Sequence, residues 1–317
     1  MIVIATCGQK THIDRNKKHM ARNISLNLKC NDVDTIPVNA FVLCLGKRMT
    51  GKSVFLQSFL GDTVHTSVAT HVLITSSPAV RQSWGPYIHP LFHIDIADCL
   101  QYLGQLIVTQ RRVVAKYGSA IPANRHVVIV MDDCASDRQV MNSRELRTIA
   151  TAGRHLCISV YITSQYFMQI RPEVRTQFDL VVCLSTSNKN NIDRLHGELA
   201  SCAPARVFKS VLKAATQNHG LLIIDNSINP VDITDSCFVH RFEYPPRHVR
   251  LGSEELWSWA DAKYFECDAH PVGEVKDDDD ALATNELRDL LGKRSYVFTD
   301  SQGDITVKSA LDKLKME

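Results

Sequence analysis

The residues with the clearest chemistry follow the apolar run Phe41 to Leu45, where the chain reads Gly-Lys-Arg-Met-Thr-Gly-Lys-Ser. The two glycines of this pattern allow the backbone to wrap closely around phosphate oxygens. Lys52 can reach the β- and γ-phosphates, and the Ser53 hydroxyl can ligate Mg2+ at the start of the next helix. A nucleoside triphosphate site is therefore predicted at Gly46, Lys47, Arg48, Met49, Thr50, Gly51, Lys52 and Ser53.

A second apolar run, His126 to Met131, ends in two carboxylates, Asp132 and Asp133. The first can hold the water shell of Mg2+, and the second can orient and deprotonate the attacking water. The alternative is that the pair only caps a helix beginning near Asp137. With the phosphate-binding segment upstream, the pattern favours a metal ligand at Asp132 and a catalytic base at Asp133.

The residues after this acidic pair argue against guanine as the base of the nucleotide. A GTPase places glycine soon after the acid linked to Mg2+, whereas Cys134 and Ala135 stand here. The guanine-reading sequence N-K-x-D is also missing, because the run from Asn188 to Asn191 has no aspartate. ATP with Mg2+ is therefore the expected cofactor.

A third apolar run, Cys157 to Thr163, has an arginine before it and a glutamine after it. Gln165 would lie beside the γ-phosphate, where its amide can sense or position water. Arg154 would lie at the opposite end of the strand, too far away to serve the same nucleotide. It could instead reach the nucleotide of a neighbouring subunit and neutralise charge in the transition state. The alternatives are a surface arginine at a helix end and a plain polar strand end.

Short runs rich in Val, Ile and Leu alternate with helical stretches after Pro37, which predicts an α/β fold with a mostly parallel sheet buried on both faces. The expected strands are 41–45, 71–75, 126–131, 157–163, 179–184 and 221–224. The expected helices are 52–60, 98–117, 137–152, 171–177, 191–199 and 206–215, with a further aromatic helix at 254–265. The predicted organisation is a basic N-terminal extension over 1–35, an ATPase domain over 36–246 and a C-terminal extension over 247–317 with an acidic linker at 276–280.

Composition excludes several classes of protein. A hydrophobic content of 44% in 317 residues is ample for a core and excludes disorder throughout. The net charge of +2 gives no global cationic field, so any contact with nucleic acid must be local. Ten cysteines at irregular spacing, without a C-x-x-C pair, predict a reduced intracellular protein rather than a disulfide framework or zinc site. No apolar run reaches the roughly 20 residues of a membrane span.

Together these segments resemble the genome-packaging ATPases of large double-stranded DNA viruses, of poxvirus type, within the HerA–FtsK superfamily of DNA pumps. The resemblance covers about 25–246 and rests on the phosphate loop, the acidic strand end, Gly153-Arg154-His155 running into Ser164-Gln165, and the run from Ile170 to Arg175. Two positions depart from the family: Asp133 stands where the wider superfamily usually has Glu, and Gln177 stands where Asn is expected after Arg175.

The resemblance implies a RecA-like core that assembles into a ring, either a hexamer or a pentamer. It assigns Asp133 as catalytic base, Gln165 as γ-phosphate sensor and Arg154 as an arginine acting in trans. The implied partners are duplex DNA, bound without sequence preference, and a viral capsid or portal vertex. The implied location is an infected host cell, in a viral factory, the cytoplasm or the nucleus, or in association with the virion.

Two other functions remain open at this point. One is a DNA translocase of the same superfamily that serves a cell or a mobile element. The other is a nucleotide-switched protein that assembles on ATP without pumping DNA. A small-molecule kinase is less favoured, because it needs an arginine-rich lid and no paired water-activating acid.

Overall fold

The computed structural model describes residues 39–62, 69–242, 249–263, 265–266 and 296–297. The predicted basic N-terminal extension and the acidic linker at 276–280 lie outside these residues.

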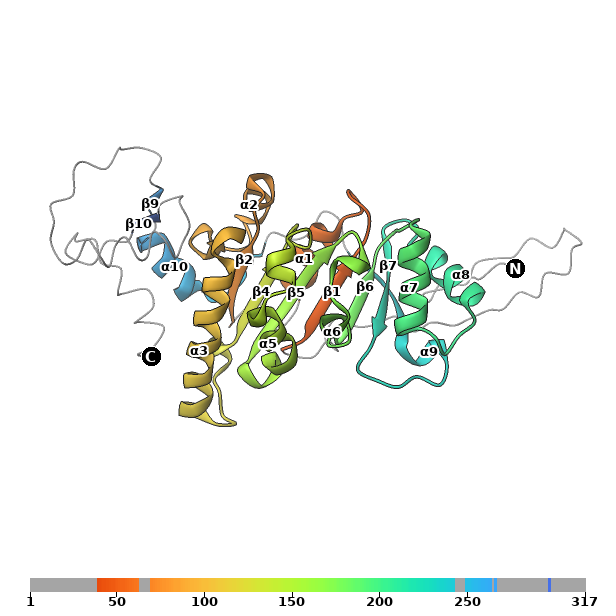
Figure 1. Ribbon diagram of the computed structural model, residues 1–317. Coiled ribbons are helices and arrows are strands. Elements are labelled where there is room, and N and C mark those ends of the chain that lie inside the picture. Colours follow the sequence, from red (N-terminus) through yellow and green to blue (C-terminus); the bar gives the residue numbers. More distant parts are fainter. Residues whose placement is uncertain (1–38, 63–68, 243–248, 264, 267–295, 298–317) are drawn as a thin grey trace, which may run out of the picture.

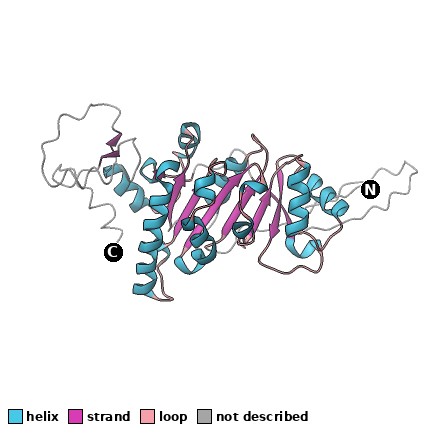
Figure 2. Cartoon of the chain, in the orientation of Figure 1, coloured by secondary structure: helices cyan, strands magenta, loops and turns pink. Residues whose placement is uncertain are grey.

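One eight-stranded sheet forms the centre of the described chain, with strand order β3-β2-β4-β5-β1-β6-β7-β8. Helices lie along both faces of this sheet (Figures 1 and 2). Its strands are β1 (Phe41–Leu45), β2 (Thr70–Ile74), β3 (His93–Ile94), β4 (Val127–Met131), β5 (Ile158–Ser164), β6 (Leu180–Cys183), β7 (Gly220–Asp225) and β8 (Cys237–Arg241). A separate two-stranded sheet pairs β9 (Phe265–Glu266) with β10 (Tyr296–Val297).

The α-helices follow the predicted ranges closely, with three differences. They are α1 (Lys52–Asp62), α2 (Pro78–Trp84), α3 (Cys99–Tyr117), α4 (Arg138–Met141), α5 (Arg144–Ala152), α6 (Pro172–Arg175), α7 (Lys189–Leu199), α8 (Ala205–Ala215), α9 (Ile233–Ser236) and α10 (Glu254–Lys263). Helices α2 and α9 were not predicted. The helix predicted over 137–152 is two helices, because the Ser143 side chain accepts a hydrogen bond from the Leu146 N–H and starts a new helix there.

Burial on both faces of the sheet explains the apolar strands. In β1 the side chains of Phe41, Leu43 and Leu45 belong to one core with α3, α5, α7 and α8. The alternate residues Val42 and Cys44 belong to a second core with α1. Since successive strand residues point to opposite faces, a strand covered on both sides has no polar alternation. The predicted α/β class is confirmed.

The sheet is mostly parallel, as predicted. The central strands β3, β2, β4, β5, β1 and β6 are parallel, but β7 is antiparallel to β6, and β8 is antiparallel to β7. Two helices, α7 and α8, separate β6 from β7. They contact each other, and Lys209 of α8 pairs with Asp193 of α7 at 2.6 Å. The pair returns the chain to the carboxyl end of β6, so β7 runs in the reverse direction.

Candidate active site

The phosphate-binding segment lies between β1 and α1 and begins with a hydrogen bond to the neighbouring strand β5. The Gly46 N–H donates to the Ser164 carbonyl at 3.1 Å, which ties the start of the segment to β5. A Cβ at Gly46 would lie 2.6 Å from the Thr50 Oγ1 and 2.8 Å from the Leu184 Cβ, so a side chain would not fit there. Gly51 has φ +90°, in the region that favours glycine. Both glycines are therefore required by this turn.

The Lys52 ammonium points back into this loop. Its Nζ donates to the carbonyls of Gly46 at 3.1 Å and Lys47 at 2.9 Å. Burial lowers the pKa of Lys52, and the negative charges of Asp132 and Asp133 act in the opposite direction. The lysine therefore lies within electrostatic reach of both acids.

Asp132 follows β4 directly and is held from two sides. Its Oδ1 accepts a hydrogen bond from the Thr163 hydroxyl at 2.7 Å, and its Oδ2 accepts one from the Trp84 indole at 2.9 Å. The residue is only 2% exposed. Two donors from different elements restrict the carboxylate to one orientation, while each oxygen keeps a lone pair for a further ligand.

Asp133 is exposed, in contrast to its neighbour. Its backbone has φ 59°, a left-handed conformation, and its N–H donates to the Thr163 Oγ1 at 3.0 Å. Thr163 thus donates to one acid and accepts from the backbone of the other. This turn directs the two acids differently, one into the protein and one toward solvent.

Strand register brings these groups together at one edge of the sheet. Leu45 of β1 lies opposite Ser164 of β5, and Met131 of β4 lies opposite Ile162. The residues that follow the strands therefore leave the sheet side by side. Gln165 follows β5 at this edge, is partly exposed, and accepts a hydrogen bond from the Asn191 side chain on its carbonyl at 2.9 Å.

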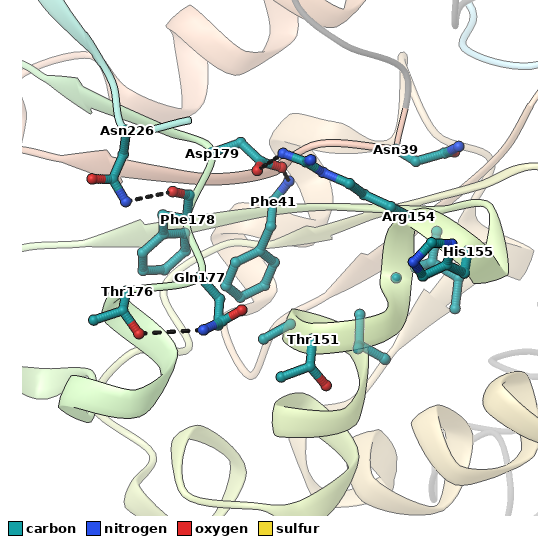
Figure 3. Close-up of a pocket in the computed structure, with 14 residues that line it drawn as sticks. Asn39, Phe41, Thr151, Arg154, His155, Thr176, Gln177, Phe178, Asp179 and Asn226 are labelled. Carbon is teal, nitrogen blue, oxygen red and sulfur yellow. Dashed lines mark hydrogen bonds and ion pairs between the residues drawn. The ribbon is translucent and has the colours of Figure 1, made fainter. Parts of the chain in front are cut away.

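Arg154 lies at the other edge of the sheet, in a short 3-10 helix before β5. Its side chain is 58% exposed, and its Nη2 donates to the Oδ1 of Asp179. A cavity of about 290 Å³ opens beside the ion pair, with Asn39, Thr151, Gln177 and Asn226 in its wall (Figure 3). The predicted separation of Arg154 from the phosphate-binding segment agrees with this placement.

Arg175, whose neighbour Gln177 departs from the family pattern, has a structural explanation. It is 4% exposed and forms two 2.9 Å hydrogen bonds with the Glu198 carboxylate of α7. Its guanidinium also lies 5.0 Å from the centre of the Phe167 ring. Arg175 therefore fastens α6 to α7, and this role does not depend on the residue at position 177.

Sequence reasoning missed Thr163 and Trp84 as partners of the acidic pair. Thr163 could have been found, because aligning the ends of neighbouring parallel strands places a hydroxyl next to the first acid. Trp84 gave no such signal, since it comes from the unpredicted helix α2, 48 residues before Asp132.

The oxygen donors at this edge suit Mg2+. Among the described residues there is no group of three His, Cys, Asp or Glu side chains that could hold a metal on its own. Mg2+ usually takes one or two protein ligands and keeps waters or phosphate oxygens for the rest. The Asp132 carboxylate and the Ser53 hydroxyl would fit that pattern, and the bound ion would supply charge neutralisation to the phosphates.

Comparison with known proteins decides the family. Residues 33–243 match the family described as Poxvirus A32 protein, well over half of the chain. The chain belongs to this family. The resemblance to poxvirus-type genome-packaging ATPases is thereby confirmed, and with it the prediction of an ATPase.

The chain is also similar to uncharacterized proteins of large DNA viruses. The uncharacterized protein 015R of Frog virus 3 is 25% identical over 234 residues, which cover 73% of this chain and 70% of that protein. The uncharacterized protein L437 of Acanthamoeba polyphaga mimivirus is 23% identical over 232 residues, covering 71% and 80% of the two chains.

Similar solved structures include the genome packaging NTPase B204 from Sulfolobus turreted icosahedral virus 2 in complex with AMPPCP. It has 17% identity and a TM-score of 0.46, and the match covers 65% of this chain and all of that one. The protein EssC (ATPases 2 and 3) from Geobacillus thermodenitrificans has 10% identity and a TM-score of 0.48, covering 66% and 40% of the two chains. No helix among the described residues is long and apolar enough to cross a membrane.

Proposed function

We propose that the protein is a motor that hydrolyses Mg-ATP to move double-stranded viral DNA into a capsid. The observation that carries this proposal is the convergence of Lys52, Asp132, Asp133 and Gln165 at one edge of the sheet, with Arg154 at the other. One edge carries the groups that would bind and hydrolyse the nucleotide of the same subunit. The other edge carries an arginine that could contact the nucleotide of a neighbouring subunit. A head-to-tail contact between subunits would bring the two edges together, and we propose that it closes into a ring of six or five subunits around the duplex.

The roles follow from the contacts of each side chain. Lys52 would exchange the carbonyls of its own loop for β- and γ-phosphate oxygens. Asp132, fixed by Thr163 and Trp84, would hold the Mg2+ water shell beside Ser53. Asp133 is exposed and would accept the proton of the attacking water, while the Gln165 amide would position that water.

Movement of DNA is the property that tests this proposal. A duplex carrying a third strand in its major groove releases that strand when a motor passes. We expect the purified protein to release it with ATP and not with a non-hydrolysable analogue. If ATP drives assembly but the third strand is not released, the nucleotide-switched protein is favoured. If the strand is released and the gene lies outside a viral genome, the cellular translocase is favoured.

Duplex binding is expected to depend on salt and not on sequence. Since the net charge of the whole chain is only +2, binding must use a few lysines and arginines grouped on one face of the ring. A footprint of about six phosphates would lose about 10³-fold in affinity between roughly 50 and 200 mM salt. Fluorescence anisotropy with two unrelated duplexes measures both properties. Affinity that is insensitive to salt, or confined to one sequence, would contradict translocation.

Thr163→Val is expected to raise the Mg2+ concentration needed for ATP hydrolysis. Valine keeps the shape of threonine but removes the hydrogen bonds to Asp132 and to the Asp133 N–H. Partners that orient metal ligands are typically worth about 10- to 100-fold in metal affinity. The measurement is a Mg2+ titration of turnover at saturating ATP. Thr148→Val is the matched control, because that hydroxyl only donates to the Arg144 carbonyl within α5. An unchanged Mg2+ requirement would show that Thr163 does not orient the metal ligand.

A further inference from the structure

The carboxylate of Asp179 holds the guanidinium of Arg154 at the edge of the sheet. Asp179 stands immediately before β6, and its side chain is 9% exposed, against 58% for Arg154. The buried carboxylate and the exposed arginine are therefore not equivalent partners in this ion pair.

Asp179 is fixed independently of Arg154. Its Oδ2 accepts the Phe41 N–H at 2.8 Å, and its own N–H donates to the Phe41 carbonyl at 2.8 Å. Its carbonyl accepts the Asn226 N–H at 2.8 Å. The preceding Phe178 ring stacks on the Phe41 ring, with centroids 4.5 Å apart. The start of β1 thus anchors the carboxylate, and Asn226 after β7 anchors the backbone of Asp179 (Figure 3).

Arg154 is the exposed member of the pair. An unrestrained arginine side chain has large rotamer entropy, which a fixed carboxylate can reduce before any second partner binds. A guanidinium has five N–H donors, and within the described residues Arg154 uses Nη2 for Asp179. Other donors remain for a second anion, and the cavity of about 290 Å³ leaves room beside them.

We infer that Asp179 is a positioning residue, which orients Arg154 so that the guanidinium can meet the γ-phosphate bound by the neighbouring subunit. This inference rests on the proposed trans role of Arg154. It adds that Asp179, held by Phe41 of β1, orients Arg154 of the same subunit before the subunits assemble. Asp179 touches neither nucleotide and acts only through Arg154.

Asp179→Asn tests this assignment. Asparagine keeps an oxygen for the Phe41 N–H but loses the charge that holds Arg154. Misplacement of a catalytic group by about 1 Å can cost about 100-fold in rate, so we expect kcat to fall roughly 10- to 100-fold. The KM for ATP should not change, because the subunit's own phosphate-binding segment is intact. Asp225→Asn is the matched control, since Asp225 ends β7 at the same edge and its Oδ1 accepts hydrogen bonds from the N–H and the hydroxyl of Ser227.

A double-mutant cycle separates positioning from general stability. In an Arg154→Lys protein, Asp179→Asn should cause no further loss of kcat, since the group it positions is already gone. Asp179→Glu keeps the charge but moves it by one methylene. It should lower kcat in the wild-type protein and cause no further loss in Arg154→Lys, and it replaces Asp179→Asn in the cycle if that variant does not fold. Subunits with Asp179→Asn should regain turnover when mixed with Asp133→Asn subunits, but not when mixed with Arg154→Lys subunits.

The possible failures are distinguishable. The inference would be overturned, and the trans role left standing, if folded Asp179→Asn had a kcat equal to or higher than the wild-type value. The same would follow if Asp179→Asn lowered kcat as much in the Arg154→Lys protein as in the wild-type protein. A wild-type kcat in Arg154→Lys would overturn the trans role itself and the inference with it.

Discussion

Asp133→Asn is expected to lower the rate of ATP hydrolysis by about two to four orders of magnitude, which is the usual contribution of a general base. The amide has the shape of the carboxylate but cannot take a proton from water. Because the Asp133 side chain is exposed and its turn is held by the backbone N–H, the substitution should leave the fold and ATP binding intact.

Lys52→Ala should also lose turnover, but through a different step. This change removes the ammonium that lies in the phosphate-binding segment, so ATP binding itself should weaken. Titration with a fluorescent ATP analogue, alongside steady-state turnover, separates the two variants. Glu173→Gln, at an exposed carboxylate on α6, is the control. Normal turnover by Asp133→Asn would mean that another group is the base.

Loss of the Arg154 guanidinium is expected to have the largest effect, because an arginine finger is worth about three to five orders of magnitude in turnover. ATP binding to the isolated subunit should be almost unchanged, since Arg154 lies at the edge of the sheet opposite the phosphate-binding segment. The mixed-subunit experiment measures whether it acts in trans. Subunits with Arg154→Ala and subunits with Asp133→Asn should each be inactive, but a mixed ring can place an intact Arg154 beside an intact Asp133.

The ion pair with Asp179 decides which variant to use. Arg154→Ala leaves the buried Asp179 carboxylate with the Phe41 N–H but without its positively charged partner, and loss of one partner of a buried group costs about 1–3 kcal/mol or more when the group is charged. Arg154→Lys keeps the positive charge for Asp179 but loses the planar fork that meets phosphate. If both variants lose turnover and Arg154→Lys keeps the wild-type melting temperature, the loss comes from catalysis and not from lower stability. If mixed rings form and recover no hydrolysis, Arg154 does not act in trans.

The sequence predicted the elements near the nucleotide well for a physical reason. A strand buried on both faces has to be continuously apolar, and a phosphate-binding turn requires glycine at Gly46 and Gly51. Both constraints are local, so the range of β1 was predicted correctly and α1 differed only in its last residues. The placement of Asp132, Asp133 and Gln165 at one edge followed from these strands, whereas their catalytic roles stay predictions.

The features that the sequence did not predict depend on long-range relations. The direction of β7 depends on the number of helices that precede it. The α7–α8 pair was present in the predicted helices, but its effect on direction was not used. The contacts of Asp132 with Trp84 and of Arg154 with Asp179 join residues 48 and 25 positions apart. No local pattern encodes such pairs, because each depends on how separate strands and helices pack.

Hydrolysis of ATP with and without duplex DNA tests the central claim most directly. For a packaging motor, the purified protein should hydrolyse ATP faster when duplex is added, with the stimulated rate lost in both Lys52→Ala and Asp133→Asn. Turnover that is the same with and without duplex, under conditions where the duplex is bound, would contradict a DNA motor and favour an ATP-dependent assembly switch.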